Sequence, residues 1–377
     1  MSYYLATIVV YFGVYGLGAL GLNLQIGLSG IANFGFIIFE SAGAYVAAIT
    51  SIGPASNGHA LSETYFWGVN LPFPLPLLLG GAAGGLLALV IGPATMRKMR
   101  RDYQAATMLA ISIIATQVIS NDVHIFNGNS GLAAIPSPLS SYLHVSLQTY
   151  DWIYAAYAMV LTGIGYLICK RISMSPFGRS LRALRDDEDA AGSVGKYQWA
   201  MKMKVFVAGG VIAGLAGALL VQYIGAWSPA AWQYAETFVL LQCVILGGIA
   251  NDKGALLGAF VVGVFLAEAP SFLPAIGYPG LIDNLQWILI GVVYIVVLWF
   301  RPQGLIPERS SLRLGVHPLF DALANDHPGA SFGLGRFGWR ARRRAEVARS
   351  SADEGGERPV VDLPAFGTND LDPTETR

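Results

Sequence analysis

Long apolar stretches separated by short polar segments make up most of the chain. A helix needs about 20 apolar residues to cross the hydrocarbon core of a bilayer, and an open structure in lipid must be helical to satisfy its backbone hydrogen bonds. We predict an all-α polytopic transmembrane bundle. Gly and Asn interrupt the second apolar stretch and the pair at 237–270, so the number of membrane-crossing helices is eight or nine. The nine stretches are roughly 3–24, 33–52, 73–96, 104–122, 150–169, 204–224, 237–250, 254–270 and 284–300.

The composition agrees with a membrane protein and excludes a soluble enzyme or a nucleic-acid-binding protein. The 377 residues are 54% hydrophobic and only 13% charged, with a mean hydropathy of +0.51. Soluble domains carry about a quarter charged residues. Residues 301–377 hold 22 of the 48 charged side chains, so the first 300 residues are poorer still. We therefore divide the chain into a transmembrane domain, 1–310, and a polar tail, 311–377, whose composition is typical of disorder.

Positive charge is distributed unevenly between the connections. Basic residues gather at Arg97–Arg101, across the connector 170–204 and in the tail from Arg301 onward, whereas the loops 53–72, 123–149, 225–236 and 271–283 have no Lys or Arg. Cytoplasmic loops of membrane proteins carry the excess of Lys and Arg. The rule predicts a cytoplasmic connector and C-terminal tail. It leaves the side of the N-terminus open, because the first two stretches have no basic flanks.

Small residues recur at helical spacing in two stretches. Gly80–Gly85 reads Gly-Gly-Ala-Ala-Gly-Gly, and Gly210, Gly214 and Gly217 follow each other along a later stretch. Such spacing lets helix backbones approach closely in a membrane. It predicts tight helix packing and by itself indicates no transport mechanism.

The connector at 175–195 is the longest hydrophilic segment between two apolar stretches. Apolar residues at near-helical spacing, Leu181, Leu184, Ala190, Ala191 and Val194, alternate there with charges. This pattern predicts two short surface helices joined by a turn. An interfacial position on lipid is one interpretation. The four acids at 186–189 favour a protein partner instead, because anionic lipid would repel them.

Six blocks of sequence carry a resemblance to a known family. The blocks, in order, are Gly21–Gly30, Gly128–Pro136, Gly178–Asp186 followed by Asp189-Ala-Ala and Gly195, Gly214–Leu219, Gly247–Gly254 with Gly258 and Ala259, and Arg301–Leu305. Together they resemble the permease family of branched-chain amino acid ABC importers, the LivH/LivM type and closer to LivM. The resemblance covers about residues 15–310, and Asp189 stands where that family usually has Glu.

This resemblance implies that the connector transmits motion from an ATPase subunit. Ala190 and Ala191 would form a close contact, and Gly195 would provide the turn between the two short helices. The chain lacks the Gly-x-x-x-x-Gly-Lys-Ser/Thr motif of nucleotide-binding loops, so ATP hydrolysis is expected from another polypeptide. The coupling residues implied are Gly178, Arg179, Arg182, Arg185, Asp189, Ala190, Ala191 and Gly195.

The resemblance also implies the rest of the assembly. The chain would be a non-catalytic subunit in the bacterial inner membrane, paired in a heterodimer with a second, related permease subunit. Two cytoplasmic ATP-binding subunits and a periplasmic substrate-binding protein would complete the importer. The substrate would be a branched-chain amino acid or a related small solute such as urea, an amide or another amino acid. No cofactor or metal is expected: Cys169, Cys243 and the five histidines have no ligand spacing.

Two similar interruptions, Gly30-Ile-Ala-Asn33 and Gly248-Ile-Ala-Asn251, raise a second hypothesis. Matching breaks in two halves of a transporter point to a transport site, and a free helix N-terminus there could receive a substrate carboxylate. A coincidence remains the alternative, with the second break a cytoplasmic turn around Asp252 and Lys253.

Polar residues within the apolar stretches are candidates for the translocation pathway. Glu40 is the most informative, because a carboxylate in a span costs roughly 2.5–3.5 kcal/mol on insertion scales. It either faces the bundle interior, a partner or water, or is neutral, or is a structural residue near the headgroups. The candidates are Asn23, Gln25, Ser29, Asn33, Glu40, Gln117, Gln222, Gln242 and Asn251.

Two other functions compete with an ATP-driven importer. An ion-gradient-driven secondary transporter or channel would account for the interrupted stretches and for Glu40, but it leaves the acidic and apolar connector unexplained. A membrane-embedded scaffold would transport nothing, so its activity would not depend on any substrate.

Overall fold

The computed structural model describes residues 2–53, 68–96, 101–138, 146–193, 195, 197–268 and 281–308. Every regular element in these ranges is a helix, and one antiparallel β-bridge pairs Leu132 with Trp227. The elements are α1 (Ser2–Leu22), η1 (Asn23–Leu28), α2 (Ile37–Ser51), α3 (Leu75–Met96), α4 (Arg101–Asn121), α5 (Val123–Phe126), η3 (Gly128–Ser130), α6 (Leu147–Met174), α7 (Pro176–Asp186), α8 (Glu188–Ser193), α9 (Gln198–Ile224), η4 (Pro229–Trp232), α10 (Tyr234–Gly247), α11 (Asp252–Gly258), η5 (Ala259–Glu268) and α12 (Leu281–Phe300).

The predicted all-α polytopic bundle is confirmed, and each of the nine apolar stretches contains a helix. Five helices are long and apolar enough to cross a membrane by length and composition: Tyr4–Leu28, α3, α4, α6 and α9. Two helices next to the interruptions are shorter. At about 1.5 Å per residue, the 15 residues of α2 and the 14 of α10 extend about 22 and 21 Å, less than the hydrocarbon core of about 30 Å.

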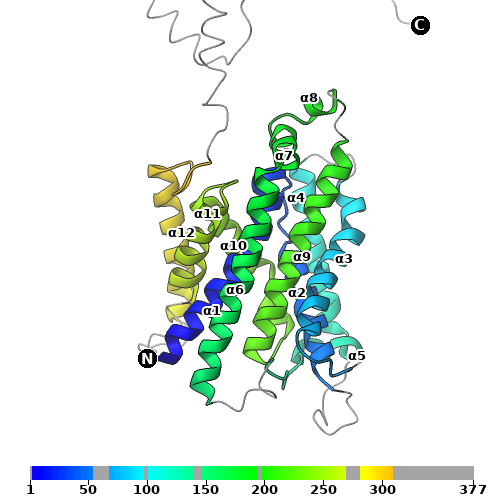
Figure 1. The fold of residues 1–377 in the computed structure, drawn as a ribbon, viewed down its shortest axis with the longest axis vertical. Helices are drawn as coiled ribbons and strands as arrows, with labels where there is room; N and C mark the ends of the chain where they lie inside the picture. The colour runs from blue at the N-terminus through cyan, green and yellow to red at the C-terminus, as the bar shows by residue number, and fades with distance from the viewer. Residues whose placement is uncertain are drawn as a thin grey trace, which may run out of the picture. The chain divides into compact units, whose positions relative to one another are not determined.

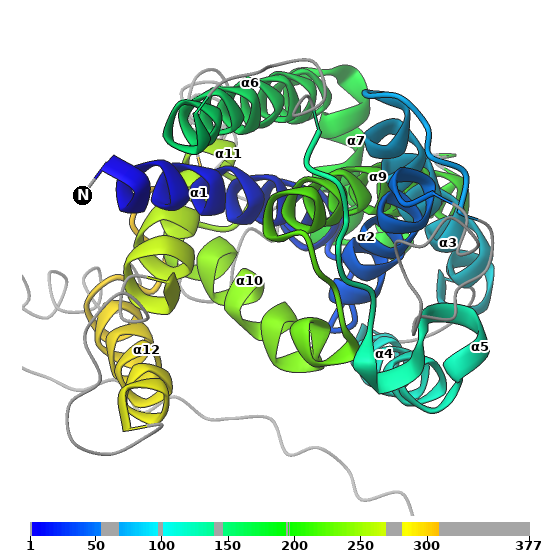
Figure 2. The same ribbon diagram turned by 90° about the horizontal axis from the view of Figure 1, so that it is seen from below.

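The helices run along one another, and the short helices mark the two ends of the bundle. Figure 1 shows α7 and α8 at one end, which we call the connector end, and the N-terminus with α5 at the other, the distal end. Seen along the bundle in Figure 2, α9 lies near the middle, between α1 and α2, and α12 lies at the edge.

The glycine-rich helices α2, α3 and α9 pack backbone to backbone, as their small residues predict. A Cβ atom added at Gly214 of α9 would overlap the carbonyl oxygen of Gly80, and one added at Gly84 would overlap that of Gly210. α2 meets the same residue of α9: a Cβ atom at Gly43 would overlap the Gly214 oxygen, and one at Gly80 would overlap the Gly43 oxygen. No side chain fits at these contacts, so dispersion between close backbones holds the three helices together.

Several predicted features lie outside the described residues. These are the tail 311–377, the basic run Arg97–Arg100, residues 54–67 and 139–145 of the predicted distal loops, and 269–280 before α12.

We expect Gly214→Ala to destabilise the protein, because its methyl group would overpack the contact with α3, at a cost of about 1–3 kcal/mol. Gly163→Ala in α6 is the matched control: no atom lies within 4 Å of the added carbon. The measurement is the temperature at which the detergent-solubilised protein loses its monodisperse chromatographic peak. Equal temperatures for the two variants would contradict the packing described here.

Candidate functional site

The predicted pair of short helices in the connector is confirmed as α7 and α8. Ser175 caps α7: its hydroxyl oxygen accepts from the Gly178 amide at 3.1 Å, and Pro176 occupies the first turn, where no amide donor is needed. α7 ends at Asp186. Asp187 is extended, and its carboxylate accepts from the Ala190 amide at 3.0 Å, which starts α8.

The two helices have a covered side and an open side. Leu181, Leu184 and Ala191 are buried against the rest of the chain, so the protein itself covers much of the predicted apolar side. The opposite side is exposed, and it presents Arg179, Asp189, Ala190 and Gly195 to the surroundings. We call these four residues the open face of the connector.

Two glycines shape this segment, one of them differently from the prediction. A Cβ atom at Gly178 would overlap the carbonyl oxygens of Ile172 and Ser173, so only glycine lets α7 fold back onto the end of α6. Gly195 has φ +78° and follows α8. The prediction that Gly195 separates the two short helices is wrong, because the extended Asp187 separates them.

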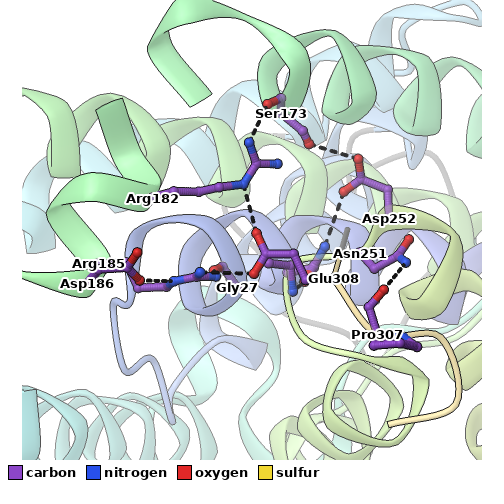
Figure 3. Close-up of polar contacts among 11 residues, drawn as sticks. Gly27, Ser173, Arg182, Arg185, Asp186, Asn251, Asp252, Pro307 and Glu308 are labelled. Atoms are coloured by element: carbon purple, nitrogen blue, oxygen red, sulfur yellow. Dashed lines mark hydrogen bonds and ion pairs between the residues drawn. The ribbon is translucent and has the colours of Figure 1, made fainter. Parts of the chain in front are cut away.

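Arg182 and Arg185 of α7 both bind the carboxylate of Glu308, in the segment after α12 (Figure 3). Arg182 Nε lies 2.8 Å from Glu308 Oε1, and Arg185 Nη2 lies 2.9 Å from Oε2. Arg182 also donates to the carbonyl oxygen of Ser173 at 3.2 Å. The sequence predicts both arginines on the coupling surface; their guanidinium groups instead turn back to the protein's own chain.

Arg185 also ties α7 to the end of the first membrane helix. Its Nη1 donates to the carbonyl oxygen of Gly27, in η1, at 2.6 Å. From α4, Arg101 Nη2 donates to the Arg185 carbonyl oxygen at 2.6 Å. α7 is therefore fixed to three separate elements besides α6: η1, α4 and the segment that follows α12.

The end of the first membrane helix, η1, lies against the second interruption. Asn23 Nδ2 donates to Asp252 Oδ1 at 3.1 Å, and Asn23 Oδ1 accepts from the Ala250 amide at 2.9 Å. The second carboxylate oxygen of Asp252 accepts from the Ser173 hydroxyl at 3.0 Å (Figure 3). We call the contact of Asn23, Ala250, Asp252 and Ser173 the helix-break joint. It connects η1, α11 and the end of α6.

The helix N-termini at the two interruptions are occupied by the chain itself. Asn251 Oδ1 accepts from the amides of Lys253 and Gly254 at 3.1 and 3.3 Å. At the start of α2, the Ile37 amide donates to the Thr237 hydroxyl at 3.1 Å. The expectation of a free helix N-terminus for a substrate carboxylate does not hold at these amides.

Three further pathway candidates, in η1 and in the segment that follows it, form a buried hydrogen-bonded group. Gln25 Nε2 donates to the Phe206 carbonyl oxygen at 2.9 Å, while Gln25 Oε1 accepts from Asn33 Nδ2 at 2.6 Å. The Ser29 hydroxyl donates to the Gln25 carbonyl oxygen at 2.6 Å. Together with Asn23 and the cap residue Asn251, they form hydrogen bonds with backbone and side-chain groups at the two breaks.

The other four candidates lie apart from this group and from one another. Glu40 lines a cavity between α1, α2, α9 and α10. Gln222 lines a second cavity, and the exposed Gln117 lines a third, with residues of η4. Gln242 lines none of these, and its Oε1 is buried without a hydrogen-bond partner in the described part of the chain. The structure therefore does not join the nine candidates into one pathway.

Within the described ranges, no three His, Cys, Asp or Glu side chains are grouped so that they could hold a metal ion. Cys169 and Cys243 are buried free thiols.

Comparison with known proteins places the chain in a family. The family described as "Branched-chain amino acid transport system / permease component" matches residues 4–298. The chain belongs to this family. It is 27% identical over 333 residues to the probable branched-chain amino acid transport permease protein LivM of Methanocaldococcus jannaschii, covering 81% of this chain and 94% of that protein.

Bacterial members are similar to this permease as well. The LivM protein of Salmonella typhimurium is 27% identical over 322 residues, covering 80% of this chain and 70% of that protein. The BraD protein of Pseudomonas aeruginosa is 24% identical over 299 residues, covering 78% and 91%. No solved structure matches the permease significantly.

Three residues that hold the end of α6 and α7 in place were not predicted to do so: Ser173, Asp252 and Glu308. Asp252 and Glu308 are acids close to the blocks Gly247–Gly254 and Arg301–Leu305, beside a connector rich in arginine. Acids in these blocks and an excess of arginine in the connector are the sequence features that could have indicated ion pairs. They identify groups in need of partners without saying which arginine pairs with which acid.

Glu308→Gln is expected to loosen α7, because the neutral amide loses both charge-assisted contacts with Arg182 and Arg185. Each pair is partly solvated, so we expect a loss of about 1 kcal/mol and roughly fivefold faster exchange of the α7 amides. The measurement is hydrogen–deuterium exchange of the 176–186 segment in the full-length protein. Asp189→Asn, an exposed acid on α8, is the control, and equal exchange in both variants would refute the anchoring role of Glu308.

Proposed function

We propose that this chain is the membrane-spanning, non-catalytic subunit of an ATP-driven importer in the bacterial inner membrane. The observation that carries the proposal is the construction of the connector. One side of α7–α8 is anchored by Arg182 and Arg185 to the body of the permease, while its open face remains exposed. A short, stiff element with one anchored side suits the transfer of a rigid-body movement.

The open face is the proposed docking surface for a cytoplasmic ATP-binding subunit. The sequence has no nucleotide-binding loop motif, so ATP hydrolysis would come from two such subunits, and no cofactor would be bound by this chain. The basic connector would face the cytoplasm under the positive-inside rule, and so would the tail 311–377. A second, related permease subunit and a periplasmic binding protein at the distal end complete the proposed assembly.

The contacts of α7 define how its movement would reach the membrane helices. A displacement of α7 acts on η1 through Arg185 and the Gly27 carbonyl group. It acts on α6 through Ser173, whose hydroxyl belongs to the helix-break joint. Both routes end where the membrane helices are interrupted. We propose that the connector and the breaks move together when ATP closes the ATPase subunits.

The substrate class follows from the relatives. The LivM and BraD proteins are named as branched-chain amino acid permeases, which supports Leu, Ile or Val as the transported solute. Urea, amides and other amino acids are the alternatives from the sequence.

Transport by the assembled importer in proteoliposomes is expected to require ATP on the side of the membrane that carries the ATP-binding subunits. An uncoupler should leave this transport unchanged. Labelled L-leucine with its binding protein is the first substrate to measure. Uptake that collapses with the uncoupler and ignores loss of ATP would establish the gradient-driven transporter instead.

Docking is tested with Ala190→Trp, because Ala190 is exposed whereas its neighbour Ala191 is buried. The bulky ring should prevent a close contact, and we expect at least tenfold less ATP-binding subunit to co-purify, a loss of about 1.4 kcal/mol or more. Ala133→Trp, an exposed position in the distal segment, should leave co-purification unchanged. Full co-purification of the Ala190 variant would exclude this face as the docking surface.

A further inference from the structure

A cavity of about 170 Å³ lies between membrane helices, away from the connector. Its walls come from α1, α2, α9 and α10 and from the segment that links α9 to α10. The lining residues are Tyr11, Val14, Tyr15, Ile37, Glu40, Leu220, Ile224, Trp227, Ala231, Glu236 and Leu240.

Glu40 is the most unusual group in this cavity. The residue is 5% exposed, yet no hydrogen bond or ion pair engages its carboxylate within the described residues. Its position is fixed by the close packing of α2 on α9: a Cβ atom at Gly217 would overlap the Glu40 carbonyl oxygen. A carboxylate held rigidly in an apolar bundle without a partner is costly, so the cavity is the place where a partner would bind.

A second carboxylate, that of Glu236 at the start of α10, lines the same cavity. Two negative charges facing one small space of low dielectric repel each other. A cation between them would relieve the repulsion and supply the missing partner of Glu40.

The remaining walls indicate what kind of cation fits. Tyr11, Tyr15 and Trp227 supply aromatic surface, and aromatic faces attract organic ammonium groups. Trp227 is held in place by the antiparallel bridge to Leu132, with N–O distances of 2.8 Å in both directions. The aliphatic residue Val14 is one of several that extend the apolar wall. A strongly hydrated inorganic ion would gain little from such walls.

We propose that this cavity binds the ammonium group of an amino acid with an apolar side chain, with Glu40 and Glu236 as its anionic partners. The inference rests on the proposed function, since it names the part of the solute that the membrane subunit recognises. The apolar side chain would lie along the aliphatic and aromatic wall.

Binding is measured directly with 3-methylbutan-1-amine, which carries an ammonium group and a branched apolar chain but no carboxylate. The purified, complete importer without its binding protein is titrated with the labelled amine. We expect Glu40→Gln to weaken binding about tenfold or more, because the amide keeps the shape and loses the charge. Glu40→Asp should restore part of the affinity. Asp151→Asn, at the start of α6 and outside the cavity, should bind like the wild type.

Transport gives a second readout. We expect Glu40→Gln to lower L-leucine uptake per ATP hydrolysed about tenfold, while the variant still assembles with the ATP-binding subunits. Unchanged amine affinity in Glu40→Gln, or displacement of the amine by sodium chloride at equal concentration, would overturn the proposal. If the wild type instead binds the amine through Glu40 but shows no ATP-dependent uptake of leucine, urea, an amide or another amino acid, the cavity assignment stands and the proposed importer function fails.

Discussion

The hydrogen bonds that close the two interrupted helices are the constraint on which the rest of the structure depends. A break in a membrane helix leaves backbone groups that lipid cannot satisfy. Here the end of the first membrane helix satisfies the second break: Asn23 accepts from the Ala250 amide and donates to Asp252, and Asp252 accepts from Ser173. The first break is closed locally, because the Gly30 and Ile31 amides donate to the carbonyl oxygens of Ile26 and Gln25. The backbone groups at the breaks named here are therefore hydrogen-bonded within the protein. The contacts of Asn23 and Asp252 form the joint that sets the position of η1 against α11 and of both against the end of α6.

Contacts close to the joint hold the connector in place. α7 follows directly after α6, and Arg185 reaches the η1 carbonyl of Gly27 while sharing Glu308 with Arg182. The arginines that the sequence assigns to a partner surface thus serve to hold α7 on the body of the permease. The open face carries Ala190 and Asp189 instead. This division of roles, anchoring on one side and exposure on the other, is what a transmitting element requires.

The sequence predicts the local features of this fold well, because they depend on neighbours in the chain. Apolar length gives the membrane helices, glycine spacing gives the contacts of Gly80, Gly84 and Gly214, and the amphipathic pattern gives α7 and α8. Partners distant in the chain could not be predicted: Asn23 and Asp252 are 229 positions apart, and Arg182 and Glu308 are 126 apart. Sequence shows that a buried polar group needs a partner, but the fold decides which one. The same reason explains why Glu236 is not among the sequence candidates, since only the fold brings it to the cavity that Glu40 lines. Gly195 is a different case: the local contact of Asp187 with the Ala190 amide ends α7 and starts α8 before the chain reaches Gly195.

The claim that the connector and the helix-break joint move as one body is tested most directly by a distance between them. Spin labels at Ala183→Cys in α7, outside the open face, and at Lys253→Cys at the start of α11 occupy exposed positions, and both native cysteines are buried. The distance would be measured by pulsed electron resonance in the complete importer, without nucleotide and with ATP trapped. Our account predicts the same distance in both states. A shift beyond the 1–2 Å of ordinary helix adjustments, more than about 2 Å, would show that α7 moves independently of the breaks and would contradict the account.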